Sequence, residues 1–322
     1  MNQETFSNIS KIIERDTKVT TYKFALLRGV IDIILENSPY IHIQDGRASI
    51  PTGLLVEKWM VYYYPIFDSE EYIPQIYGNA NIAFRDKFLD VIRYYKDKGG
   101  LSVFYNDLKY KGIPQEIRVD FLALANKMAD TIIKMPMKYI GRSITDEYYS
   151  IFNYERPWLR NISHEINLNW LIHQYGSFSI PADYFEAFSL LGSFMNGKDS
   201  IFLKWAEFSV NASKEPLAIE RVIGKVLISP ITDRDVQQSK KIYKEILSEQ
   251  KQVYCVWTGA EITRYDIDHM IPFSAWKNND LWNLLPARPN VNRIKRNKIP
   301  DADTIEEYKT ALEESEGDVE MM

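Results

Sequence analysis

The chain has 322 residues, of which 45% are hydrophobic and 26% are charged, the proportions of an ordinary globular protein with room for one large or two medium domains. No apolar stretch approaches the roughly 18 residues of a membrane span, and the N-terminal segment is polar and acidic, unlike a signal peptide, so we expect a cytoplasmic protein with no membrane partner. The single cysteine, Cys255, excludes an intrachain disulfide and a zinc site made of four thiolates.

The net charge of −5 is unevenly distributed. Residues 251–300 contain eight Lys and Arg residues against four Asp and Glu residues, whereas residues 301–322 contain one lysine against nine acids. The basic segment favours a polyanionic ligand. The acidic tail is either a solvated C-terminal helix that frays or a segment that competes with a polyanion for the basic site.

Residues 1–250 have mainly helical patterns, and we interpret them as a recognition or regulatory region. Apolar residues recur every three or four positions in the segment 20–38, and residues 40–50 alternate around a glycine, which predicts a helix and then a hairpin. Pro51 opens a further helix that Pro65 limits. Other helices are expected at 83–98, 101–112, 114–135, 182–197, 199–213, 216–227 and 233–250, with a few strands between 137 and 180.

A change of pattern near residue 250 marks a second domain, although no linker-like composition precedes it. The strand-like runs VYCVWTG, RYDIDHMI and DLWNLLP are followed by a basic, helix-like run, PNVNRIKRNK. The expected fold class is therefore α+β: a mostly helical region with a few short strands, then a small strand–strand–helix domain at 251–300 and the tail at 301–322. Such a small domain can hold one divalent cation between strand and helix.

Three side chains in this domain suit phosphodiester hydrolysis. The carboxylate of Asp268 and the amide oxygen of Asn292 are donors that Mg²⁺ or Mn²⁺ prefers. His269, with an ordinary pKa near 6.5, can deprotonate water at neutral pH. Neighbouring strand residues point to opposite faces, so Asp268 and His269 need a twist or a loop edge to face one phosphate. We expect the remaining histidines, which lack ligand spacing, to be structural or at the surface: His42, His164 and His173.

The stretch from Cys255 to Pro300 resembles the HNH endonuclease module, which has the ββα-metal fold. Its motif residues are similar to those of the HNH nuclease domain in RNA-guided CRISPR effectors, including asparagine as the last motif residue. The matching elements are TG at 258–259, DHMIP at 268–272, Asn283 and NRIK at 292–295.

This resemblance implies a role for five residues. Asp268 and Asn292 are the expected metal ligands, and His269 is the expected base that activates water. Asn283 is expected to hold the loop that positions the histidine. Lys295 is expected to contact phosphate or to stabilise charge.

The stretch departs from many restriction and homing relatives because it lacks their zinc-binding cysteine pairs. No structural zinc is therefore expected, and asparagine in the last motif position favours Mg²⁺-type occupancy. Apolar packing must then support the module, with Trp257, Trp276, Trp282 and Leu284 as candidates. The whole chain more loosely resembles bacterial HNH proteins linked to restriction or antiphage defence.

The sequence thus predicts a metal-dependent HNH endonuclease acting on DNA. One alternative is a catalytically silent module that docks nucleic acid or protein, and another is a nuclease subunit licensed by a partner ATPase or sensor protein. A homodimer is a further option, because one such site cuts one strand. The choice between DNA and RNA, and between a nick and a double-strand break, stays open at this level.

Overall fold

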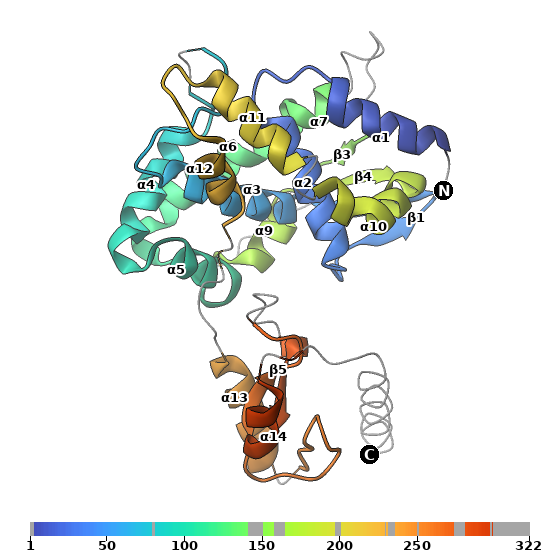
Figure 1. The fold of residues 1–322 in the computed structure, drawn as a ribbon, viewed down its shortest axis with the longest axis vertical. Helices are drawn as coiled ribbons and strands as arrows, with labels where there is room; N and C mark the ends of the chain where they lie inside the picture. The colour runs from blue at the N-terminus through green and yellow to red at the C-terminus, as the bar shows by residue number, and fades with distance from the viewer. Residues whose placement is uncertain are drawn as a thin grey trace. The chain divides into compact units, whose positions relative to one another are not determined.

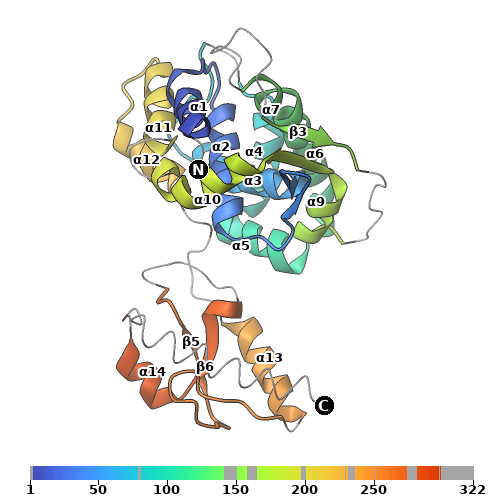
Figure 2. The same ribbon diagram turned by 90° about the vertical axis from the view of Figure 1, so that its right-hand side faces the viewer.

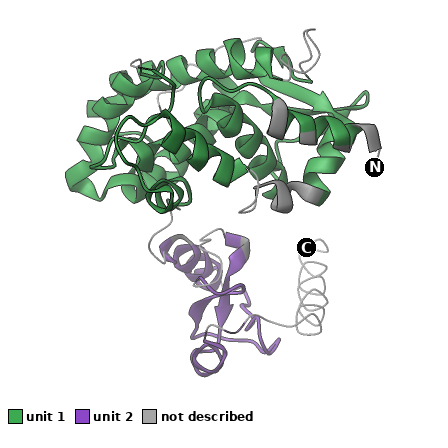
Figure 3. Ribbon diagram, turned by 45° about the horizontal axis from the view of Figure 1, so that its top comes forward, with its two compact units in different colours: residues 1–230 green, residues 231–322 purple. Residues whose placement is uncertain are grey.

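The computed structural model describes residues 3–78, 81–140, 151–157, 165–196, 201–228, 230, 236–249, 251–273, 281–296 and 298 (Figure 1). The chain divides into two compact units, Met1–Pro230 and Ile231–Met322 (Figure 3). This division lies before the boundary at residue 250 that the sequence pattern suggested, because the helix ahead of that boundary packs into the second unit. Among the described helices, none has the length and apolar character needed to cross a membrane.

The first unit is built from helices at nearly all the positions that the sequence predicted. Glycines in the left-handed region end two of them, Gly99 at φ 110° and Gly112 at φ 86°. The helices are α1 (Gln3–Arg15), α2 (Tyr22–Leu35), α3 (Thr52–Phe67), α4 (Arg85–Tyr95), α5 (Gly100–Asn106), α6 (Arg118–Lys134), α7 (Pro136–Tyr139), α9 (Leu168–Gln174), α10 (Ala182–Asn196), α11 (Ile201–Ala212) and α12 (Ile219–Val226), with short 3₁₀ or π segments at 96–98, 107–111 and 115–117.

Helix α3 is the centre of this unit, because it is apolar on nearly every face and is packed on all sides. The side chains of Trp59 and Tyr63 have 0% of their surface exposed. The largest fully buried side chains of this unit are aromatic, and they form much of its core. The sequence predicts that Pro65 limits this helix. The helix continues to Phe67, because burial of the last two residues stabilises the extra half-turn.

A four-stranded antiparallel sheet lies beside the helices, with strand order β1-β2-β4-β3. Strands β1 (His42–Gln44) and β2 (Arg47–Pro51) form the predicted hairpin, whose turn residues Asp45 and Gly46 both have positive φ angles. The other strands are β3 (Asn153–Glu155) and β4 (Ser177–Pro181).

The interval 137–180 was predicted to hold strands, and β3 and β4 confirm this in part. Helix α9 and most of α7 also lie there, which the sequence analysis missed. In α9, Asn167 caps the first turn by accepting a hydrogen bond from the N–H of Trp170. The parts of this prediction that fall on 141–150 and 158–164 lie outside the described residues.

The second unit contains α13 (Gln237–Ser248), β5 (Asp266–His269), a 3₁₀ turn (Leu281–Asn283), β6 (Leu284–Ala287) and α14 (Pro289–Lys295). The two strands pair antiparallel, α13 contacts β6 and α14 contacts β5 (Figure 2). The predicted order of strand, strand and helix is therefore present. The run VYCVWTG, predicted as an extra strand, forms only one bridge, Tyr254 to Glu261, because its chain turns back at Gly259.

This unit has its own small core. Its centre is formed by Val253, Cys255, Ile262 and Ala287. The apolar face of α13 packs against it through Tyr243, Ile246 and Leu247, and the hydroxyl of Ser239 donates a buried hydrogen bond of 2.9 Å to the carbonyl oxygen of Leu284. These contacts are the reason that α13 belongs to the second unit.

Candidate functional site

Strand β5 carries the candidate acid and histidine on its last two residues. Asp268 and His269 pair with Leu285 and Leu284 of β6, and their exposed fractions are only 3% and 2%. A buried carboxylate is costly unless it is paired or hydrogen-bonded. The partners of Asp268 therefore indicate what the site is built to hold.

Two donors meet one oxygen of the Asp268 carboxylate. The indole Nε1–H of Trp257 donates a hydrogen bond of 2.8 Å to Oδ2, and the ammonium of Lys295 lies 3.1 Å from the same atom. Lys295 also donates a hydrogen bond of 2.6 Å to the carbonyl oxygen of His269, and its Nζ lies 5.0 Å from the centre of the Trp257 ring. The carboxylate is thus already matched with a cation.

His269 and Asp268 have different surroundings. The imidazole of His269 packs edge-on against the ring of Phe273, with the ring centres 5.3 Å apart. The carboxylate of Asp268 meets Trp257 and Lys295 instead, as the alternation of side chains along a strand predicts. What links the two neighbours is Lys295, which contacts the side chain of one and the backbone of the other.

Asn283 braces the turn that follows His269. Its side chain is fully buried; its Oδ1 accepts a hydrogen bond of 2.8 Å from the N–H of Ile271, and its Nδ2 donates one of 3.1 Å to the Ile271 carbonyl oxygen. Its own carbonyl oxygen accepts the N–H of Met270. This is the bonding that the role expected for Asn283 requires, and the role itself stays a prediction.

Helix α14, which carries the last motif residue, contacts the same strand. Pro289 occupies its first turn, and Arg296 follows its end at a positive φ of 51°. Asn292 lies three positions before Lys295, so both residues lie on one side of α14, and Lys295 reaches β5. Asn292 itself is half-buried.

The donor set fits a hard divalent cation that keeps most of its water. Among the described residues no group of three or more His, Cys, Asp or Glu side chains could hold a metal ion. One carboxylate (Asp268) and one amide oxygen (Asn292), with the remaining positions left to phosphate and water, is the kind of coordination that Mg²⁺ accepts. The ammonium on Asp268 shows that this carboxylate accommodates positive charge.

The predicted support of the module by apolar packing is confirmed for Leu284, which is buried, and for Trp257, which packs against the small core. The side chains of Trp276 and Trp282 lie outside the described residues. Cys255 is part of the same core, and its Sγ accepts a hydrogen bond from the N–H of Arg288.

The polar function of Trp257 is the feature that sequence reasoning missed. Its distance of 11 positions from Asp268 follows no motif spacing, and only the turn before Gly259 brings the two side chains together.

The cations after Pro286 divide into two groups. Lys295 is buried against Asp268, whereas the exposed ones are Arg288, Arg293, Arg296 and Lys298.

Two family models match the chain, one over each unit. The first covers residues 2–225 and is described as a domain of unknown function, DUF8808. The chain belongs to this family. The second model, described as HNH endonuclease, covers residues 255–301 and therefore contains Asp268, His269, Asn283 and Lys295.

The second match supports an HNH domain and nuclease activity in general, in agreement with the resemblance found in the motifs. Helix α13 lies between the two matched segments, although it packs on the core of the HNH unit. No curated protein and no solved structure matches the chain.

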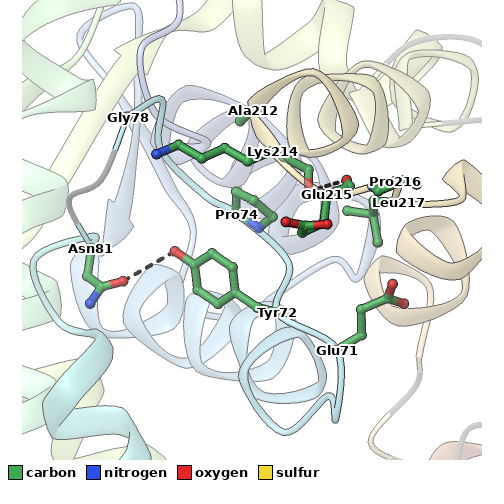
Figure 4. A pocket seen from close by; sticks show the side chains of 11 residues that line it. Glu71, Tyr72, Pro74, Gly78, Asn81, Ala212, Lys214, Glu215, Pro216 and Leu217 are labelled. Carbon is green, nitrogen blue, oxygen red and sulfur yellow. Dashed lines mark hydrogen bonds between the residues drawn. The ribbon is translucent and has the colours of Figure 1, made fainter.

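The DUF8808 unit contains a pocket of about 490 Å³ (Figure 4). Its lining includes the charged side chains of Glu71, Lys214 and Glu215. Tyr72 also lines the pocket, and its hydroxyl donates a hydrogen bond of 3.3 Å to Oδ1 of Asn81. Arg221 pairs with Glu71 at 2.9 Å. The two histidines described in this unit, His42 and His173, are exposed and lie apart from this pocket's lining, as the surface expectation requires.

Proposed function

We propose that the chain is a metal-dependent HNH endonuclease that hydrolyses phosphodiester bonds in DNA with its second unit. The observation that carries this proposal is the buried contact between Asp268 and Lys295. It joins the motif acid on β5 to α14, the helix that carries the last motif residue, Asn292. The match to an HNH endonuclease family over the same residues supports it.

Each residue of the site has one task in this proposal. Asp268 and Asn292 would hold a Mg²⁺ or Mn²⁺ ion, which would supply positive charge against the negative charge that develops on the phosphate and on the leaving oxygen. His269 accepts a proton from water as the water oxygen bonds to phosphorus and one ester P–O bond breaks. Asn283 fixes the turn after His269, and Lys295 places a positive charge beside the reacting phosphate.

Charge at the surface of α14 supports a nucleic-acid substrate. The exposed cations that follow β6 can neutralise backbone phosphates, which supplies much of the affinity of proteins for DNA. They are Arg288, Arg293, Arg296 and Lys298. The DUF8808 unit then recognises DNA, a partner or a trigger, and restriction or antiphage defence is the setting that this arrangement fits.

A second candidate function is favoured by the burial of the histidine. With 2% of its surface exposed and its ring against Phe273, His269 reaches a phosphate only after neighbouring groups move. A nuclease subunit licensed by a partner ATPase or sensor protein would rest in such a state. Purified protein that cuts only when that partner is added distinguishes this function from an autonomous nuclease.

The deciding experiment is plasmid cleavage by purified protein with Mg²⁺ or Mn²⁺. We expect His269→Ala to lower the cleavage rate at least about 100-fold, because a general base contributes factors of that order. The matched control is His173→Ala, which removes an exposed imidazole from the first unit and should leave the rate unchanged. Cleavage at the wild-type rate by His269→Ala would contradict the proposal.

The metal assignments have a separate readout. We expect Asp268→Ala and Asn292→Ala to raise the Mg²⁺ concentration needed for half-maximal cleavage as well as to lower the rate. An unchanged Mg²⁺ titration in both variants rules out their roles as ligands.

A further inference from the structure

Trp257 lies on a turn that is fixed on both sides. The N–H of Val256 donates a hydrogen bond of 2.9 Å to the carbonyl oxygen of Pro286 in β6, and the N–H groups of Thr258 and Gly259 both donate to the carbonyl oxygen of Cys255. Gly259 adopts a positive φ of 60°, which lets the chain turn back. The turn therefore presents the indole from a defined position.

The indole N–H and the Lys295 ammonium together define the orientation of the Asp268 carboxylate. Both contact Oδ2, at 2.8 Å and 3.1 Å, and in the described part of the chain these two contacts are the ones that the carboxylate makes. A carboxylate oxygen has two lone pairs, so two donors on Oδ2 fix the plane of the group and direct Oδ1 to a new ligand. A single donor would leave the group free to rotate about its last bond.

We propose that Trp257 is a positioning residue of the metal centre, whose indole N–H sets the orientation in which Asp268 binds the divalent cation. This inference rests on the proposed function, in which Asp268 is a metal ligand. Groups that hydrogen-bond to a metal ligand raise the affinity for the metal by fixing the ligand before the ion arrives, and their loss typically costs about 10- to 100-fold in affinity.

The two other roles of Trp257 can be separated from this one. Its ring packs on the core of Val253, Cys255 and Ile262, and its face lies near the Lys295 ammonium. The substitution Trp257→Phe keeps an aromatic ring beside the core and removes the N–H donor together with part of the ring volume, and the control Trp205→Phe makes the same change of side chain. A loss of metal affinity in this variant therefore reports the hydrogen bond.

The test is direct binding of Mn²⁺, followed by electron paramagnetic resonance in the full chain without DNA. We expect Trp257→Phe to weaken binding about 10- to 100-fold, and to raise the metal concentration for half-maximal cleavage by a similar factor while changing the rate at saturating metal only a few-fold. The matched control is Trp205→Phe, which removes an indole hydrogen bond of 2.9 Å to Gln75 inside the first unit and should leave Mn²⁺ binding unchanged.

Three outcomes are distinguishable. Weaker binding in Trp257→Phe, with unchanged binding in Trp205→Phe, supports the proposal. Equal binding in Trp257→Phe and wild type, with binding lost in Asp268→Ala, overturns the role of Trp257 and leaves the proposed function intact. Wild-type binding that Asp268→Ala does not weaken overturns the metal centre itself. Thermal unfolding checks that Trp257→Phe is folded, and Trp257→Tyr replaces it in the same comparison if it is not.

Discussion

The side-chain amide of Asn283 acts as a clamp across the turn that follows His269. Both of its polar atoms bond to the backbone of Ile271, so the peptide groups on either side of Ile271 are held in one conformation. Because this buried amide makes both hydrogen bonds, removing the side chain would leave the N–H and the carbonyl oxygen of Ile271 without these partners. The conformation of the turn that follows His269 therefore depends on the side chain of Asn283.

We expect Asn283→Ala to lower the free energy of unfolding of the second unit by about 1–3 kcal/mol, because it leaves buried backbone groups unpaired. Cleavage should fall with it at temperatures where the unit is still folded. Chemical denaturation and plasmid cleavage measure the two effects.

The control for this variant is Ser239→Ala. It removes another buried hydrogen bond of the same unit, to the carbonyl oxygen of Leu284, but does not touch the turn. It should cost about 1 kcal/mol of stability and leave the cleavage rate unchanged. Equal loss of cleavage in the two variants would show that Asn283 acts through stability alone.

At the scale of elements, α3 and α9 of the first unit approach each other closely at Gly53. A Cβ atom on Gly53 would lie 1.9 Å from the carbonyl oxygen of Leu171 and 2.6 Å from the backbone nitrogen of Ile172. Backbone atoms cannot rotate away as a side chain can. The glycine is thus the reason that the two helices can touch.

We predict that Gly53→Ala lowers the free energy of unfolding of the first unit by at least about 3 kcal/mol, at the upper end for overpacking, because α9 must move away from α3. The control is Gly224→Ala in α12, where a Cβ would meet no atom within 4 Å. Gly224→Ala should instead stabilise the helix by about 0.5–1 kcal/mol. Denaturant unfolding of both variants checks the sign, and a stable Gly53→Ala protein would contradict the predicted contact.

The whole molecule consists of two units with separate cores, so we expect two unfolding transitions. The first unit contains a buried acid, Glu57, with 4% of its surface exposed. Burial raises the pKa of this carboxyl, opposed by the neighbouring ammonium of Lys58. The folded unit therefore binds a proton more tightly at Glu57 than the unfolded chain does.

This shift predicts how stability depends on pH. As the pH rises from the ordinary glutamate pKa through the raised one, the unfolding free energy of the first unit falls, because the folded state holds a proton that the unfolded state has released. Glu57→Gln should remove this part of the pH dependence. At pH values above neutral, it should raise the melting temperature of the first unit. The transition of the second unit should be the same in both proteins, and calorimetry at pH 5 and pH 8 measures both.

The sequence by itself determined the features that depend on residues close together in the chain. Helical periodicity with Gly and Pro at the ends located most helices of the first unit, and alternation around a glycine located the hairpin of β1 and β2. The motif spacing located the HNH segment, which the family match supports. These signals are local, so they survive without knowledge of the fold.

Only the tertiary structure decided which distant residues meet. Helix α9 was missed because seven residues with a buried face carry too few repeats for a helical period, and α13 joined the second unit through packing that no local pattern encodes. The same holds for Trp257, which looked like an apolar core residue until the fold brought its N–H to Asp268. Local preferences determine where each helix and strand forms. The partners of a buried charge such as Asp268, in contrast, are the donors that the folded chain brings within hydrogen-bond distance.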